Sequence, residues 1–220
     1  MNSKLDFRIL NSGSFQNKAF VMLHGWKGNK NSFVSISKML DIPNCRWYFP
    51  EAPFKVDGDP QKKTWTYEKE PGIWETDVPK VMLSNFFDNE VFDSFDPIDT
   101  YVMGFSQGAA VCYSFILTLD YAFGGIFPVG GFIRNSPEQS DKDAASRLYV
   151  SDKQKDTPIL IGHGKDDDII PPEASEIAYS LLKDKCSNVN LNIYNGRHKI
   201  GLGYLRDVKA MILKKESLKA

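Results

Sequence analysis

A serine flanked by two glycines is the feature of this chain best suited to chemistry. Ser106 lies in the segment GFSQG at 104–108, which fits the pattern G-x-S-x-G. An apolar run at 101–103 precedes the segment and an apolar stretch at 109–119 follows it, as expected of a strand, a tight turn and a helix. The glycines avoid side-chain clashes in such a turn, and the helix N-terminus directs free N–H groups towards developing negative charge. The pattern predicts a nucleophilic serine. The alternative is an ordinary strand–helix turn in which the serine caps the helix.

A base must remove the hydroxyl proton before a serine can attack. The chain has three histidines, His24, His163 and His198. In α/β-hydrolases, which carry this kind of turn, the triad runs serine, acid, histidine along the chain. His24 precedes Ser106, and His163 leaves no room for an acid on a strand-end loop before it. His198 is therefore the predicted base, and the alternative is an ordinary loop histidine.

The acid should follow a strand, because sites in open α/β sheets form at the carboxyl ends of the strands. The segment HGKDDDIIP at 163–171 supplies three adjacent aspartates, Asp166, Asp167 and Asp168. Its task would be to orient the imidazole and stabilise the charged ring, and the pattern alone does not choose among the three. Carboxylates also suit hard cations, but three consecutive loop residues rarely converge on one ion. No metal site is predicted.

Two N–H groups should hold the negative charge that develops on the substrate oxygen. One is expected from Gln107, the residue after the serine. The other should come from a loop after an early strand. The segment LHGW at 23–26 runs from an apolar strand into a glycine turn, which makes the Trp26 N–H the candidate. His24 then has a structural role, with its ring bracing this loop.

Short apolar runs alternate with amphipathic segments along the chain, which predicts βαβ units and a mostly parallel sheet flanked by helices. The short connection at 11–17 suggests that the first strand runs antiparallel. The expected strands are 7–10, 19–23, 46–49, 100–104, 125–129, 159–162 and 190–194. The expected helices are 32–40, 78–91, 107–119, 173–183 and 202–215. We expect one domain over residues 1–220, without a separate lid domain.

Two stretches lack clear periodicity and are predicted as loops. The stretch 50–77 is rich in Pro, Gly and charge but carries Trp65, Tyr67 and Trp74. Long loops are often functional, so Trp65 and Trp74 are candidates for lining the substrate site; the alternative is aromatics that tuck into the core. The stretch 135–156 is charged and is expected to be a solvated excursion.

Composition narrows the classes of partner. The 220 residues carry 27 basic and 28 acidic side chains, a net charge of -1, which gives no general attraction to nucleic acid or to anionic membranes. The N-terminus is too polar for a secretory signal, and no apolar stretch reaches the roughly 20 residues of a membrane span. The three cysteines suggest neither a disulfide framework nor a metal cluster. We expect a cytoplasmic protein, a monomer or homodimer, with no nucleic-acid partner and no stable membrane insertion.

Taken together, these motifs resemble the phospholipase/carboxylesterase family of α/β-hydrolases, which includes the acyl-protein thioesterases. The resemblance extends from about residue 20 to residue 198. The matching segments are LHGWKGNKNSF at 23–33, FPEAP at 49–53, GFSQGA at 104–109, GGF at 130–132 and HGKDDDIIP at 163–171.

This resemblance assigns further roles. Counting back from Pro171 makes Asp167 the catalytic acid. The oxyanion donors carry over as Gln107 and as Trp26, which often is leucine in the family. Lys165 replaces a family aspartate, and the histidine follows its glycine by two residues rather than three.

The family resemblance implies two-step acyl transfer without a cofactor, on a small-molecule acyl ester or thioester. Members that act on lipid-modified proteins carry an apolar run where this chain has the charged TWTYEK at 64–69. We therefore expect a serine carboxylesterase for small to medium acyl groups. The alternatives are a thioesterase for long acyl chains, a lactonase or peptidase with the same triad, and a catalytically silent binding protein of the hydrolase fold.

Overall fold

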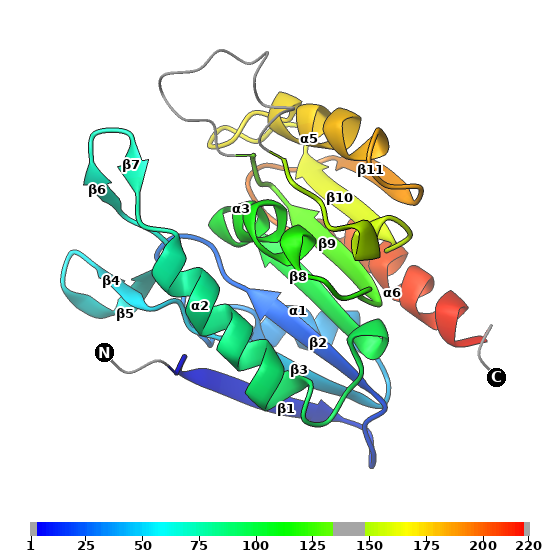
Figure 1. Ribbon diagram of the computed structural model, residues 1–220. Helices are drawn as coiled ribbons and strands as arrows, with labels where there is room; N and C mark the ends of the chain where they lie inside the picture. Colours follow the sequence, from blue (N-terminus) through cyan, green and yellow to red (C-terminus); the bar gives the residue numbers. More distant parts are fainter. Residues whose placement is uncertain (1–3, 134–147, 218–220) are drawn as a thin grey trace.

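A seven-stranded sheet forms the centre of the protein (Figure 1). The computed structural model describes residues 4–133 and 148–217. Along the sheet the strands follow the order β1-β3-β2-β8-β9-β10-β11, and β1 alone runs antiparallel to its neighbour. The strands are β1 (Phe7–Ser12), β2 (Lys18–Leu23), β3 (Cys45–Pro50), β8 (Thr100–Phe105), β9 (Gly125–Val129), β10 (Ile159–Gly164) and β11 (Val189–Tyr194). The predicted parallel sheet and its antiparallel first strand are confirmed.

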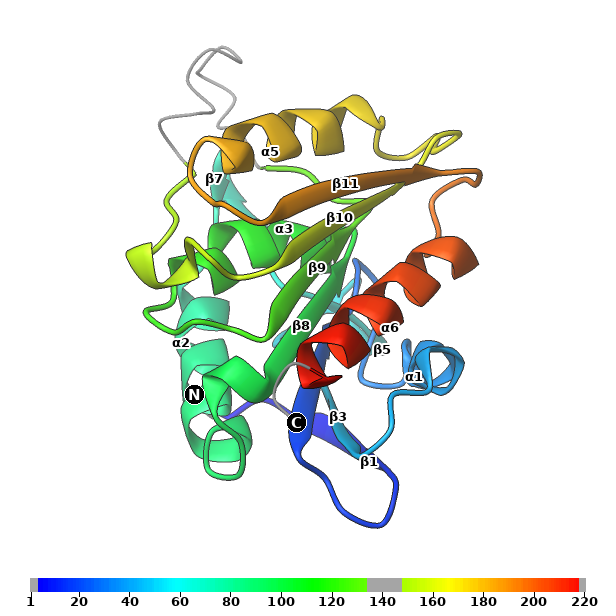
Figure 2. The same ribbon diagram turned by 90° about the vertical axis from the view of Figure 1, so that its right-hand side faces the viewer.

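Helices cover both faces of this sheet (Figure 2). One face carries α2 (Asp77–Phe86), α3 (Gln107–Ser114) and α5 (Glu173–Lys183). The other carries α1 (Val34–Leu40) and α6 (Leu202–Ser217). Each face has its own buried apolar cluster, because strands that are covered on both sides turn alternate side chains to opposite layers.

Two expected helices end earlier than periodicity predicts. The helix after Ser106 stops at Ser114, and Phe115 leaves the helical conformation before a short 3₁₀ turn at Ile116–Thr118. The helix expected to reach residue 91 is α-helical to Phe86 and continues as a π-helical turn, Phe87–Val91. The wider turn lets Phe86, Phe87 and Val91 all face the core.

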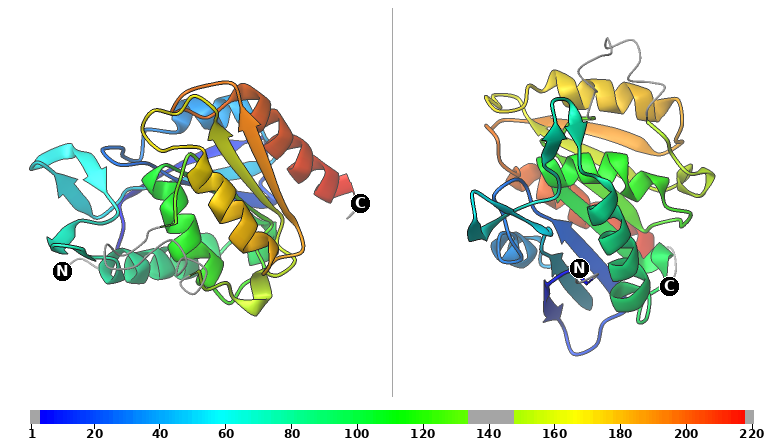
Figure 3. Two further views of the ribbon diagram at one scale, coloured as in Figure 1. Left: turned by 90° about the horizontal axis from the view of Figure 1, so that it is seen from above. Right: turned by 60° about the vertical axis from the view of Figure 1, so that its left-hand side comes forward.

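The stretch 50–77 is not the loop that its composition predicts. It forms two small hairpins, β4 (Phe54–Val56) with β5 (Asp59–Thr64) and β6 (Glu68–Glu70) with β7 (Ile73–Trp74). Both project from one side of the molecule (Figure 3). The expected excursion at 135–156 lies largely outside the described residues. In its described part Asp152, Lys153, Lys155 and Asp156 are exposed as predicted, whereas Ser151 and Gln154 are buried.

The order of the strands makes the boundary between β2 and β8 a topological switch point. From β2 the chain leaves through α1 on one face of the sheet, whereas from β8 it leaves through α3 on the other. The loops after two such neighbouring strands diverge, and in open α/β sheets ligands bind in the resulting crevice at the carboxyl ends. Trp26 and Ser106 lie in these two loops.

Candidate active site

Ser106 occupies a strained turn between β8 and α3. Its backbone has φ 53° and ψ -115°, a conformation that non-glycine residues rarely adopt. Such a residue costs on the order of 1–3 kcal/mol and persists only where the surroundings hold it. Here the Ser106 N–H donates to the Val129 carbonyl at 2.8 Å, and the Ser106 carbonyl accepts from the N–H groups of Ala109 and Ala110. The turn therefore presents the serine at the carboxyl end of the sheet.

The two glycines of the turn are required by close backbone packing. A Cβ atom on Gly108 would lie 2.0 Å from the Leu23 carbonyl oxygen at the end of β2. A Cβ atom on Gly104 would lie 2.2 Å from the Gly108 carbonyl oxygen. No other residue type fits at either position while β2, β8 and α3 keep this spacing.

Asp167 and His198 form a close pair. Asp167 Oδ2 lies 2.6 Å from His198 Nδ1, and the Asp167 side chain is only 1% exposed. Its other oxygen accepts hydrogen bonds from the N–H groups of Ile169 and Ile170 at 2.9 and 3.0 Å. Burial alone would raise the pKa of Asp167, but the hydrogen bonds from Ile170, His198 and Ile169 outweigh it and hold that pKa below its usual value. The carboxylate is thus charged and aimed at the imidazole.

The two neighbouring aspartates point elsewhere. Asp166 is exposed, and Asp168 is more than half exposed and pairs with Arg197 at 3.2 Å. The loops that carry the aspartates and His198 are joined by backbone hydrogen bonds from Lys165 to Tyr194 and from Asp166 to Gly196. Of the three adjacent carboxylates, the structure brings Asp167 to His198.

The imidazole of His198 lies beside the serine turn. Its ring centroid is 4.8 Å from that of Phe105, the residue before Ser106. A Cβ atom on Gly130, which follows β9, would lie 3.5 Å from two atoms of the same imidazole. Among the described residues, no hydrogen bond joins the Ser106 hydroxyl to His198. Catalytic hydrogen bonds of this kind often tighten only when substrate binds.

His163 supports the Asp167 loop, a role that the sequence did not reveal. It is fully buried, and its Nε2 lies 2.9 Å from the Ile170 carbonyl oxygen and 3.2 Å from Asp167 Oδ2. Its Nδ1 lies 2.6 Å from Ser175 Oγ. Because the carbonyl can only accept, Nε2 carries a proton. A histidine–glycine pair at the end of β10 was the available signal, and it was not distinctive.

The two predicted oxyanion donors belong to segments that adjoin Ser106. Gln107 is the first residue of α3, so its N–H has no acceptor within the helix. The Trp26 N–H donates to no acceptor among the described residues. The loop that carries it passes close to the serine, since a Cβ atom on Gly25 would lie 3.2 Å from Ser106 Cβ. Their role as donors to an oxyanion stays a prediction.

His24 is buried and holds this loop in place. Its Nδ1 lies 2.8 Å from the Gly25 carbonyl oxygen and so donates to it, and its Nε2 accepts from the Ala52 N–H at 3.0 Å. Burial lowers the pKa of His24 to about 4, so the ring stays neutral near pH 7. Both ring nitrogens are occupied, as the expected bracing role requires.

The two tryptophans named as substrate-lining candidates lie in different settings. Trp65 is 1% exposed, and its indole N–H donates to the His24 carbonyl at 2.8 Å. Trp74, on β7, is 37% exposed. Contact of either ring with substrate stays a prediction. The burial of Trp65 matches the alternative of an aromatic that packs into the core.

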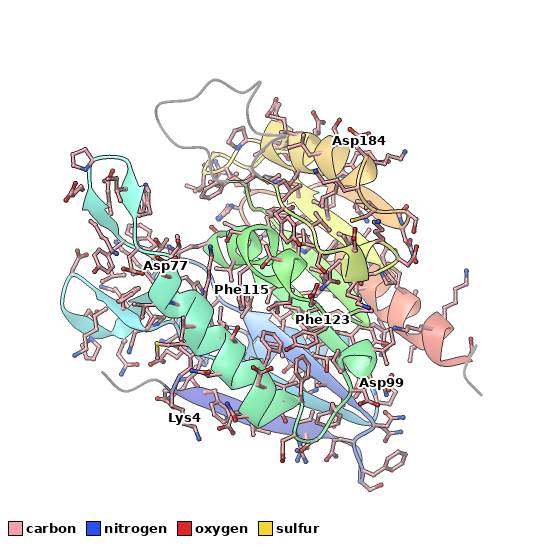
Figure 4. The ribbon with its side chains drawn as sticks, in the orientation of Figure 1. Lys4, Asp77, Asp99, Phe115, Phe123 and Asp184 are labelled. Carbon is pink, nitrogen blue, oxygen red and sulfur yellow. The ribbon has the colours of Figure 1, made fainter. Side chains whose placement is uncertain are left out.

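Two of the hollows in the described part of the protein lie at very different distances from this site. A cavity of about 60 Å³ between α2 and α3 is lined by Trp65, Gln107 and Phe115, among others. Figure 4 labels Phe115 and also Asp77, the first residue of α2, on this side of the sheet. A groove of about 1060 Å³ lies instead against α6 and the residues that begin the parallel strands, at the opposite end from Ser106. The larger groove is therefore separate from the site.

The sequence matches one known protein family over most of its length. Residues 5–215 match the model of the family described as Phospholipase/Carboxylesterase. The chain belongs to this family. Acyl-protein thioesterase 1 of Kluyveromyces lactis is 25% identical over 94% of this chain and 96% of its own length. Carboxylesterase SOBER1 of Arabidopsis thaliana is 24% identical over 80% of this chain and 79% of its own length.

Solved structures agree on the fold. The crystal structure of esterase PE8 superposes with a TM-score of 0.78 at 23% identity, covering 96% of this chain and 99% of that one. A Bacillus cereus carboxylesterase superposes with a TM-score of 0.75 at 18% identity, covering 97% of this chain and 95% of that one. The protein has the α/β-hydrolase fold and belongs to a family of esterases and thioesterases. No helix among the described residues is long and apolar enough to cross a membrane.

Proposed function

We propose that this protein is a serine carboxylesterase that hydrolyses small to medium acyl esters. The observation that carries the proposal is the Asp167–His198 pair at 2.6 Å beside the strained turn of Ser106. A buried carboxylate that holds a histidine next to a serine on such a turn is the arrangement of acyl-transfer enzymes. Membership of the phospholipase/carboxylesterase family supports the same reaction class.

The proposed reaction has two steps. His198 takes the hydroxyl proton as Ser106 attacks the acyl carbonyl, and Asp167 stabilises the imidazolium that forms. The N–H groups of Trp26 and Gln107 hold the oxyanion. His198 then gives its proton to the leaving alcohol, and water, activated by the same histidine, releases the acid from the acyl-enzyme.

The preference for shorter acyl chains rests on the segment after β5. Thr64, Trp65 and Thr66 are buried, and the next strand, Glu68–Glu70, exposes only charged side chains. Within residues 64–70 Tyr67, 44% exposed, is the one exposed apolar side chain, and the neighbouring β7 also exposes Ile73 and Trp74. The preference for shorter chains therefore rests on the buried Thr64–Thr66 and the charged β6 alone. An acyl-protein thioesterase is the second candidate, because relatives such as that of Kluyveromyces lactis carry this name and because Trp26 and Ile169 expose large apolar side chains.

A chain-length profile separates the candidates. Hydrolysis of p-nitrophenyl esters from acetate to palmitate would be measured for the wild-type protein and for Ser106→Ala. We expect the highest kcat/KM at short or medium chains and no activity in the variant. A maximum at palmitate would replace the proposal with the long-chain thioesterase. An inert wild-type protein that also fails to react with a fluorophosphonate would indicate a binding protein.

A further inference from the structure

Three consecutive residues at the end of the β4–β5 hairpin contact both sides of the oxyanion site. The first, Lys63, pairs through its backbone with the loop that carries Trp26. Its carbonyl accepts from the Lys27 N–H at 2.9 Å, and its N–H donates to the Gly28 carbonyl at 3.0 Å. Lys27 has a φ of 63°, so this pairing also holds a residue in the uncommon left-handed conformation directly after Trp26.

The next two residues are bound by the side chain of Gln107. The Trp65 N–H donates to Gln107 Oε1 at 3.0 Å, and Gln107 Nε2 donates to Thr64 Oγ1 at 2.8 Å. The Thr64 hydroxyl donates in turn to the Thr66 carbonyl at 2.7 Å. Since the Trp65 N–H can only donate and the Thr66 carbonyl can only accept, the orientation of the Gln107 amide is determined. All of these groups are buried.

The third contact comes from the Trp65 indole. Its Nε1 donates to the His24 carbonyl at 2.8 Å, and its ring lies 5.2 Å from the His24 imidazole, centroid to centroid. The His24 carbonyl belongs to the peptide unit that leads into Gly25 and Trp26. Trp65 therefore links two segments. Its backbone binds the side chain of Gln107, the residue after the nucleophile, and its indole binds the start of the loop that bears the second N–H group.

We infer that residues 63–65 position the oxyanion site, and that the indole N–H of Trp65 sets the separation of the Trp26 and Gln107 N–H groups. The inference rests on the proposed function and assigns Trp65 a positioning role rather than contact with substrate. Oxyanion donors act only when they lie 2.7–3.1 Å from the developing charge, and loss of one donor costs about 10²–10³ in rate. A displaced donor loses part of that effect.

The test replaces Trp65 by phenylalanine, which keeps an aromatic ring but removes the N–H that reaches the His24 carbonyl. The matched control is Trp47→Phe. Trp47 is also 1% exposed, and its indole N–H makes one hydrogen bond, to Ser12 Oγ at 2.8 Å, near the far edge of the sheet. Thr64→Val, which removes the hydroxyl that binds Gln107, is the second test variant.

Three quantities are measured for each protein: kcat and KM with p-nitrophenyl acetate, Tm, and the inhibition constant of a trifluoromethyl ketone, whose bound form carries an oxyanion. For Trp65→Phe we expect kcat to fall roughly tenfold, KM to stay within twofold, and the inhibition constant to rise in parallel with the loss of kcat/KM. Thr64→Val should shift the same quantities in the same direction. Trp47→Phe should lower Tm without changing kcat or the inhibition constant.

Wild-type kcat in both Trp65→Phe and Thr64→Val would overturn the inference while leaving the proposed function intact. So would a loss of kcat with an unchanged inhibition constant, because the oxyanion contacts would then be unaltered. If Trp65→Phe does not fold, Thr64→Val decides alone. Failure of the proposed function itself shows separately, as an inactive wild-type protein or as activity that persists in Ser106→Ala.

Discussion

Replacing Asp167 by asparagine should abolish nearly all activity, because the hydrogen bonds around this side chain fix the orientation of the new amide group. Oδ1 accepts from two backbone N–H groups, those of Ile169 and Ile170. In Asp167→Asn the amide oxygen must keep that position, because an NH₂ group there would face two donors. The NH₂ group then faces His198 Nδ1 and donates to it, which moves the imidazole proton to Nε2.

A histidine protonated at Nε2 cannot accept the proton of Ser106. The corresponding aspartate-to-asparagine change in a serine hydrolase lowers kcat by about 10⁴. We therefore expect a loss of roughly 10⁴, equivalent to about 5.5 kcal/mol of activation free energy. The NH₂ group would also face the protonated His163 Nε2, which lies 3.2 Å from Oδ2.

The assay measures hydrolysis of one ester substrate. Active-site titration gives the concentration of folded protein to which kcat refers. Asp166→Asn and Asp168→Asn are the matched controls, because both carboxylates are exposed and lie next to Asp167 in the chain. Each should keep kcat within about twofold, since an exposed ion pair such as Asp168–Arg197 contributes little. More than a tenth of the wild-type kcat in Asp167→Asn, or a larger loss in either control, would refute this reasoning.

Two predictions concern stability. Burial lowers the pKa of His24 from 6.5 to about 4, so below pH 6.5 the unfolded chain binds a proton that the folded state does not bind. The free energy of unfolding should fall by about 2.5 kcal/mol from about pH 7 to pH 4.5 through this residue. Urea denaturation at the two pH values should show a smaller fall for His24→Gln than for the wild type. Equal falls in the two proteins would contradict this role of His24. Gly108→Ala places a Cβ atom 2.0 Å from the Leu23 oxygen and should cost at least 1–3 kcal/mol. Gly203→Ala in α6, where no atom lies within 4 Å, should instead stabilise the protein by up to about 1 kcal/mol, so similar Tm values for both would be inconsistent with the packing described.

Much of the fold is readable from the sequence because its signals are local. Buried parallel strands such as Val21–Leu23 are short apolar runs, and the strand–turn–helix at Ser106 is encoded by adjacent residues. The order of nucleophile, acid and base along the chain then predicted His198 as the base, and the structure places it beside Asp167. The acid was narrowed to three adjacent aspartates, and family resemblance, not the pattern, selected Asp167.

The parts that were missed depend on contacts distant in sequence. Strand β5 reads DPQKKT, which has neither alternation nor apolar residues. Besides its hairpin partner β4, it pairs through Lys63 with the distant Gly28. The end of α3 was predicted five residues late. In a segment that is apolar on all sides, the spacing of apolar residues does not change where the helix ends. The links from Gln107 to Thr64 and from Trp65 to His24 join residues about 40 positions apart, so spacing along the chain does not reveal them.

Covalent labelling of the serine tests the central claim most directly. Wild-type protein and Ser106→Ala would be treated with a fluorophosphonate, and the intact mass and the modified peptide would be determined by mass spectrometry. We predict one adduct per wild-type chain, located on Ser106, and none in the variant. Labelling that persists in Ser106→Ala, or a wild-type protein that hydrolyses esters without an adduct at Ser106, would contradict the assignment of this residue as the nucleophile.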